Sequence, residues 1–189
     1  MIPSLFRLTS AKGSPRVVWI FSLMLYALCA SLPVHASSKT PGKVIAGWVE
    51  KITLPASKAS TKAITIKAKL DTGAETSSIH AENIKIYKRG GKRWVDFTLV
   101  IKDTDDKTHR ITMKKPLELR VKIKKHDGDH DSRPIVELDI CFDGRIHSTL
   151  FSLVDRSEFI YPALLGRKFI EGVALVDPQA SFLTQAYCE

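Results

Sequence analysis

Asp71 has the sequence context of an acid–base residue. It begins the tripeptide Asp71-Thr72-Gly73, directly after residues 64–70, in which apolar and polar side chains alternate. Alternation with a period of two that runs into an Asp-Thr-Gly turn predicts a strand that ends by presenting one carboxylate. The glycine lets backbone N–H groups approach that carboxylate closely, and the turn holds it at the strand end. Asp71 is therefore the predicted catalytic residue.

A second cluster of possible ligands lies between His126 and Asp131. Two histidines and three aspartates occur there within six residues, and imidazole and carboxylate groups can hold a divalent ion. The cluster spans the apex of a predicted hairpin, however, and its Asp-Gly pair is itself a turn signal. No cysteine or third histidine stands nearby in the sequence. We therefore predict a solvated hairpin tip and assign no metal site.

Two serines and a histidine follow the Asp-Thr-Gly turn closely. Ser77 and Ser78 could act as nucleophiles only beside a positioned base, and their spacing to His80 does not imply that geometry. A histidine packed under the turn is the commoner arrangement. The sequence therefore predicts no serine nucleophile here.

The elements that must position these residues are mostly strands. Strand-like segments recur with turn residues about every ten positions, and no segment shows sustained helical periodicity. The predicted strands span residues 44–54, 64–70, 84–87, 95–101, 117–123, 136–142, 146–154, 173–176 and 182–183, with one short helix at 168–171. Segments 117–123 and 136–142 are expected to form a long hairpin. Asp177-Pro178 is expected to end the strand at 173–176. This pattern is typical of an all-β sandwich or barrel.

Residues 1–36 have the composition of a secretory signal peptide. Basic residues precede an apolar run at 17–32, and a small-x-small cleavage site ends at Ala36. An uncleaved anchor is the alternative, although the run is short for a membrane span. Residues 37–43 are the expected linker and residues 44–189 the folded domain. We expect a periplasmic or secreted protein that has no membrane attachment once the signal peptide is cleaved.

The positive net charge does not indicate a nucleic-acid partner. The formal net charge is +9, but its lysines recur at alternating strand positions, which the solvated outer face of a sheet explains. No nucleic-acid partner is expected.

Cys141 and Cys188 are the cysteines beyond the predicted cleavage site, and an oxidising compartment could close them into a disulfide. Whether they meet is left open, and one buried and one loose thiol is the simpler expectation.

Two motifs resemble those of retropepsins, the dimeric aspartic proteases of retroviruses. Residues 71–76, Asp-Thr-Gly-Ala-Glu-Thr, resemble the active-site motif, and residues 163–167, Ala-Leu-Leu-Gly-Arg, resemble the apolar-apolar-Gly-Arg signature near the end of that fold. The hairpin at 117–142 lies where retropepsins place the flap. An ordered set of motifs over residues 44–183 is closer still to a bacterial retropepsin-like family often labelled ATP-dependent zinc proteases.

The zinc and ATP in that label have no counterpart in this sequence. Nucleotide hydrolysis would require a Gly-rich phosphate loop ending in Lys-Ser or Lys-Thr, and a zincin would require His-Glu-x-x-His on a helix. The sequence contains neither motif. We therefore expect no cofactor.

The resemblance implies a fold and a set of roles. The fold would be a closed retropepsin-like β-barrel with one short C-terminal helix. Aspartic proteases need two carboxylates that share a proton, and this chain has one Asp-Thr-Gly, so a second copy would supply the second Asp71. Arg167 would form an ion pair with Glu75, and Thr72 would hydrogen-bond across the dimer. The supporting residues would be Thr72, Gly73, Ala74, Glu75, Gly166 and Arg167, and the flap would carry His126, Asp127, Gly128, Asp129 and His130.

The expected function is that of an aspartic endopeptidase of the bacterial envelope, hydrolysing peptide bonds as a homodimer. The alternative keeps the fold without the reaction. It is a non-catalytic periplasmic protein that binds a peptide or a metal.

Overall fold

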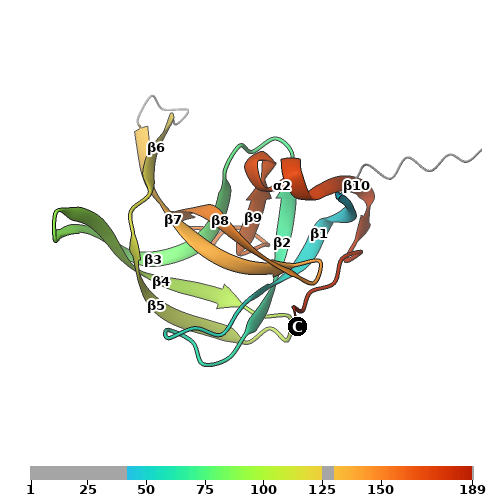
Figure 1. Cartoon of the computed structure of the whole chain (residues 1–189), viewed down its shortest axis with the longest axis horizontal. Helices are drawn as coiled ribbons and strands as arrows, with labels where there is room; N and C mark the ends of the chain where they lie inside the picture. The colour runs from blue at the N-terminus through green and yellow to red at the C-terminus, as the bar shows by residue number, and fades with distance from the viewer. Residues whose placement is uncertain (1–41, 125–129, 189) are drawn as a thin grey trace, which may run out of the picture. The chain divides into compact units, whose positions relative to one another are not determined.

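The strands follow one another with few interruptions and form one ten-stranded sheet, six strands of which close into a barrel (Figure 1). The computed structural model describes residues 42–124 and 130–188. Its elements are β1 Val44–Leu54, β2 Ile64–Asp71, β3 Ser77–Arg89, β4 Lys92–Lys102, β5 Thr108–Pro116, β6 Leu119–Lys124, β7 His130–Phe142, β8 Arg145–Val154, β9 Ala163–Gly166, α2 Arg167–Val173 and β10 Ala174–Ser181. The predicted all-β barrel with one short C-terminal helix is confirmed.

The predicted alternation accounts for the core. On β4 the side chains of Val95, Phe97, Leu99 and Ile101 are each at most 1% exposed, and β2 buries every second residue from Ile64 to Leu70. Burying one such side chain contributes roughly 1.5–3 kcal/mol. The same apolar face that fills the barrel therefore fixes the register of β2, and with it the position of the residue at its end.

One strand from the C-terminal half lies between two strands of the N-terminal half. β9 pairs in parallel with β2, which sets Asp71 beside Gly166, and pairs antiparallel with β3, which sets Ile79 beside Ala163. Segments almost a hundred residues apart in sequence therefore meet at the turn that follows β2.

The end of the chain departs from the predicted strands. β10 continues through Asp177-Pro178, so the predicted stop was wrong. β10 is an edge strand, where a proline without an N–H need not break a ladder. The predicted strand at 182–183 was also wrong, because Phe182 adopts a φ of 59° and turns the chain away.

A buried carboxylate holds the segment that follows β10. Glu50 is 0% exposed and accepts hydrogen bonds from the N–H of Gly47 at 2.6 Å, the N–H of Leu183 at 2.9 Å and the hydroxyl of Thr184 at 2.9 Å. A buried carboxyl group is tolerated when its oxygens are this well satisfied. Glu50 thereby ties the C-terminal segment to β1.

Cys141 and Cys188 form a disulfide, so the expectation of two free thiols was wrong. Cys141 is buried on β7, and the C-terminal segment reaches it because Thr53 also holds the segment, donating its hydroxyl to the carbonyl of Ala186 at 2.7 Å. The path of residues 182–188 over the barrel decides the pairing. The spacing of the two cysteines in sequence does not contain that information.

Replacing Cys188 with serine should destabilise the fold. The disulfide closes 47 residues, which the loop-entropy account converts to about 4 kcal/mol, within a usual range of roughly 2–4 kcal/mol. Chemical denaturation of the Cys188→Ser protein should give a lower midpoint than the unchanged protein. A reducing agent should lower the midpoint of the unchanged protein only. Equal midpoints for both proteins would contradict the prediction.

The predicted signal peptide lies outside the described residues, as does the linker apart from residues 42 and 43. No helix in the described part of the chain is long and apolar enough to span a membrane.

Candidate functional site

Asp71 is the last residue of β2, as predicted, and its carboxylate is held by the turn that follows. Oδ1 accepts a hydrogen bond from the N–H of Gly73 at 2.9 Å, and the N–H of Ala74 closes the turn on the carbonyl of Asp71 at 3.2 Å. A Cβ at Gly73 would lie 3.1 Å from Oδ1, so glycine gives the carboxylate room to approach the backbone. The Asp71 side chain is 26% exposed, which leaves it accessible to a substrate.

Lys69 is a site residue that the sequence argument missed. Its Nζ lies 3.3 Å from Oδ2 of Asp71, because residues two apart on a strand share a face. Burial raises the pKa of Asp71, but the Gly73 hydrogen bond and the Lys69 ammonium together outweigh it and hold that pKa below its ordinary value. In the single protomer, Asp71 is therefore kept ionised.

Arg167 braces the active-site turn through backbone oxygens. Its Nη1 donates to the carbonyl of Thr72 at 3.0 Å and to that of Gly73 at 2.8 Å. Among the described residues, the carboxylate of Glu75 pairs with Lys168 at 2.9 Å, so the predicted ion pair between Arg167 and Glu75 was wrong. The reason is that the first turn of α2 lies along the loop, so neighbouring residues take separate partners.

Gly166 lies directly against the backbone of the same turn. A Cβ there would be 2.7 Å from the carbonyl carbon of Thr76 and 2.9 Å from the oxygen of Glu75. The N–H of Gly166 donates to the hydroxyl of Ser77 at 3.1 Å, and Ser77 is 2% exposed. The motifs at 71–76 and 163–167 thus build one site, as the resemblance implied.

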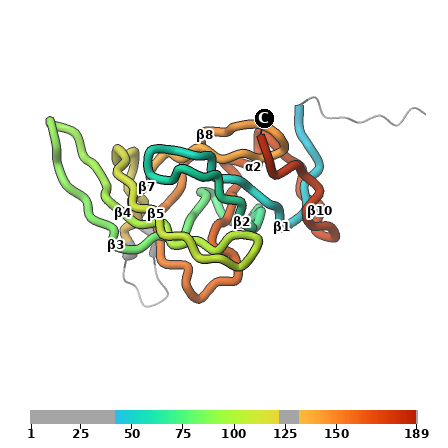
Figure 2. The backbone as a smooth tube through the Cα atoms, turned by 90° about the horizontal axis from the view of Figure 1, so that it is seen from below, coloured from blue at the N-terminus to red at the C-terminus, as the bar shows by residue number. Residues whose placement is uncertain are grey.

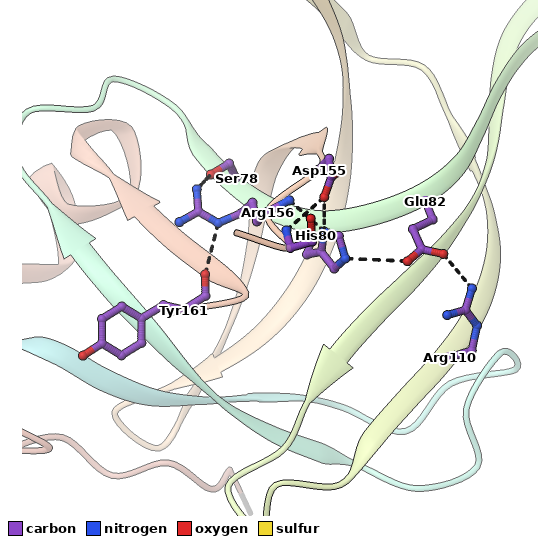
Figure 3. A network of polar contacts seen from close by, with 8 residues as sticks. Ser78, His80, Glu82, Arg110, Asp155, Arg156 and Tyr161 are labelled. Atoms are coloured by element: carbon purple, nitrogen blue, oxygen red, sulfur yellow. Dashed lines mark hydrogen bonds and ion pairs between the residues drawn. The ribbon is translucent and has the colours of Figure 1, made fainter. Parts of the chain in front are cut away.

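A network of polar contacts surrounds Arg156 (Figure 3). Arg156 donates from Nη1 to the hydroxyl of Ser78 at 3.0 Å and from Nε to the carbonyl of Tyr161 at 3.2 Å. Its backbone N–H donates to Nδ1 of His80 at 2.8 Å, so the ring proton sits on Nε2, which faces Glu82. His80 is 7% exposed, and its side-chain contacts are with Arg156, Asp155 and Glu82.

Arg156 also contributes charge near the site, and no motif in the sequence predicted it. Arg156 is 8% exposed. Burial lowers the pKa of Arg156, the charge of Arg133 lowers it further, and the charge of Asp71 opposes both. Arg156 and Lys69 thus place two cations around one carboxylate.

The predicted flap is only partly described. β6 and β7 pair from Leu119 with Ile135 to Lys124 with His130, so a hairpin is present at this position. The predicted pairing of 117–123 with 136–142 was wrong, because residues 136–142 pair with β8 instead. His126, Asp127, Gly128 and Asp129 lie outside the described residues, and His130 is described only as the first residue of β7. Within residues 42–124 and 130–188, no group of three or more His, Cys, Asp or Glu side chains could hold a metal ion.

Replacing Lys69 with glutamine should raise the pKa of Asp71, because the opposing ammonium charge is removed. A carboxylate whose pKa is lowered by folding stabilises the native state above its unfolded pKa, and this contribution disappears as the pH falls through the folded pKa. The variant should therefore lose stability earlier on acidification. Carbon-detected NMR titration of the Asp71 carboxyl measures the shift. Lys67→Gln, on the same face of β2 but without the contact, should leave the pKa unchanged.

Known proteins match most of the folded region. A family model described as RimB-like, retropepsin-like aspartic endopeptidase RimB, matches residues 45–186. A probable alpha-L-glutamate ligase from Shewanella pealeana is 37% identical over 125 residues, which are 62% of this chain and 25% of the relative. One from Parasynechococcus marenigrum is 30% identical over 139 residues, 74% of this chain and 29% of the relative. The chain spans about a quarter of the length of these curated relatives.

A solved structure shares the fold. A protein of unknown function from Legionella pneumophila is 32% identical, with a TM-score of 0.59, over 75% of this chain and 98% of that protein. The match to the family model contains both halves of the site, from the Asp71 turn to Arg167. The chain therefore belongs to the RimB-like family of retropepsin-like aspartic endopeptidases.

Proposed function

We propose that this protein is an aspartic endopeptidase that hydrolyses peptide bonds as a homodimer, with one Asp71 from each protomer. The observation that carries the proposal is the Asp71 turn, whose carboxylate is fixed by Gly73 and remains accessible. Thr72 and Gly73 are exposed at the tip of that turn, where a second copy could pack against them. The family to which the chain belongs supports the same reaction.

Two facing Asp71 carboxylates would divide the chemistry. Like charges at close range cannot both remain ionised, so the pair would hold one proton between them. The ionised carboxylate would take a proton from water, which then attacks the scissile carbonyl, and the protonated one would donate a hydrogen bond to the carbonyl oxygen. Arg167 would keep each turn in place through its bonds to Thr72 and Gly73.

The proposed location is the periplasm or the extracellular space. Support comes from the signal-like residues 1–36 and from the Cys141–Cys188 disulfide, which persists in oxidising compartments. The partners would then be a second copy of the chain and a peptide or protein substrate of that compartment.

Acidic peptides are the substrates we propose first. The matched relatives are named probable alpha-L-glutamate ligases, and we extend from that name a preference for peptides of α-linked glutamate. The cations around Asp71, Lys69 at 3.3 Å and the buried Arg156, would favour carboxylate side chains near the scissile bond.

A cleavage assay at several protein concentrations tests the reaction and the dimer together. Oligoglutamate and oligoglutamine peptides of equal length would be followed by mass spectrometry, with oligomeric state measured by sedimentation. Activity per mole should rise through the dimerisation range, favour oligoglutamate, and persist in a chelator. Cleavage by a species that sediments as a monomer at every concentration would contradict the proposal. A preference for oligoglutamine would overturn only the substrate assignment.

A further inference from the structure

The hairpin of β3 and β4 extends beyond the barrel as a separate arm. In both views the turn that joins these strands projects away from the other strands (Figures 1 and 2). The backbone at the turn is formed by Gly90 and Gly91, with φ of 55° and 75°. We call residues 85–94 the basic arm. Nothing in the site around Asp71 accounts for it.

The basic arm carries an unbalanced positive charge. Its ten residues include Lys85, Lys88, Arg89, Lys92 and Arg93 and no acidic residue. The four nearest the turn are exposed. Within the part of the chain that the structure describes, none of these four makes an ion pair. Their charges therefore face solvent without a counter-charge from the fold.

The register of the strands makes this charge costly. Lys88 lies directly opposite Arg93, and Arg89 lies directly opposite Lys92. Like charges in direct cross-strand pairs destabilise a hairpin, and opposite charges would stabilise it. Two such pairs in succession are unfavourable for the isolated fold. They become favourable when a negatively charged partner binds the tip.

The shape and the base of the arm favour a flat partner. A projecting tip without a groove can approach a plane, whereas an enclosed ligand would need a concave site. Behind the four cations, Tyr87 and Trp94 form a half-buried cross-strand pair. Tyrosine and tryptophan side chains favour the boundary between headgroups and water in membranes. The four cations and the two rings all lie within three residues of the turn, so both kinds of side chain can contact the headgroup level of an anionic bilayer.

We propose that the basic arm docks the protein onto a membrane surface of anionic phospholipids, which replaces the expectation from sequence that the cleaved protein has no membrane attachment. Each lysine or arginine near such a surface strengthens binding about fivefold at low salt. Four cations together give a substantial but reversible attraction that salt weakens. The choice of lipid over nucleic acid rests on the proposed envelope location, while the charge and register do not depend on the protease reaction.

Vesicle co-sedimentation tests the proposal. Residues 39–189 form a compact unit that contains every described element, so this fragment is tested without the apolar residues 17–32. Vesicles of phosphatidylcholine and phosphatidylglycerol in a roughly two-to-one ratio should bind it, and vesicles of phosphatidylcholine alone should not. The variant with glutamine at positions 88, 89, 92 and 93 should bind the anionic vesicles about 600-fold more weakly, a factor of about five for each of the four charges.

A matched control changes the same number of charges elsewhere. Lys58, Lys62, Lys102 and Lys107 are all exposed and lie outside the arm, so their joint replacement by glutamine should leave most of the binding. The arm variant should also melt at or above the temperature of the unchanged fragment, since two repulsive pairs are removed. If it is less stable, the separate pair variants, 88 with 93 and 89 with 92, should each weaken binding about 25-fold.

Three results would overturn the proposal. One is equal binding by the arm variant and the unchanged fragment. Another is an equal loss in the control variant, which would mean that net charge alone attracts the fragment. The third is binding to double-stranded DNA at the same ionic strength that is as strong as binding to vesicles and is lost in the arm variant. That result would assign the arm to nucleic acid.

Discussion

An Asp71→Asn protein is expected to lose peptide cleavage, with kcat/KM falling by roughly a thousandfold or more. The asparagine oxygen can still accept the 2.9 Å hydrogen bond from Gly73, so the turn keeps its shape. An amide can neither take a proton from water nor share one with a second side chain. The variant should therefore fold and dimerise like the unchanged protein. Cleavage rates and sedimentation are the two measurements.

Asp177→Asn is a matched control for that variant. Asp177 also accepts a hydrogen bond from the N–H two residues later, that of Gln179 at 2.8 Å, but it lies on β10 away from the site. It should retain full activity. Mixing the Asp71→Asn protein with unchanged protein should lower activity more than dilution does, because mixed dimers carry a single carboxylate. If the Asp71→Asn protein still cleaves peptides, the proposed mechanism is wrong.

Most of the fold could be predicted from the sequence because the strands bury alternate residues. The pattern at 95–101 predicted β4, and all four of its apolar side chains are buried. The hairpin within 117–142 was an equally local signal, although its strands pair nearer to the tip than predicted. The prediction that Pro178 ends a strand was wrong because β10 is an edge strand. A proline at an edge position need not donate a hydrogen bond to a neighbouring strand.

Part of the candidate site could be predicted from the sequence. The motifs identified Asp71, Gly166 and Arg167, and the structure brings them together. The role of Arg167 depends on how the start of α2 lies along the loop, which no spacing reveals. Arg156 is likewise 85 residues from Asp71 in sequence (156 minus 71). Only Lys69 had a local signal, since it shares a strand face with Asp71, and that signal was not used.

The pairing of Cys141 with Cys188 also depends on long-range contacts that the sequence does not reveal. Cys188 reaches β7 because Glu50 and Thr53 hold the segment between Ser181 and Cys188. A buried glutamate that accepts hydrogen bonds from a distant segment has no signature in sequence. Contacts that depend on long-range paths were therefore missed, and those set by strand period were found.

Replacing Gly166 with alanine is expected to cost several kcal/mol of stability, roughly 3 kcal/mol or more. The added Cβ would lie 2.7 Å from the carbonyl carbon of Thr76 and 2.9 Å from the carbonyl oxygens of Glu75 and Thr76. All three neighbours are backbone atoms, so no side chain can rotate away. The loop or β9 must shift instead, and β9 pairs with β2 at Asp71. The midpoint of chemical denaturation measures the loss.

Gly172→Ala provides the control, because the two glycines are six positions apart and only one is crowded. Gly172 lies in α2, and a Cβ there meets nothing within 4 Å. Alanine should keep or raise stability at this site, by up to about 1 kcal/mol, since it favours a helix over glycine. The crowding argument requires the two variants to move in opposite directions. If Gly166→Ala unfolds at the same midpoint as Gly172→Ala, the loop and β9 are not in tight contact.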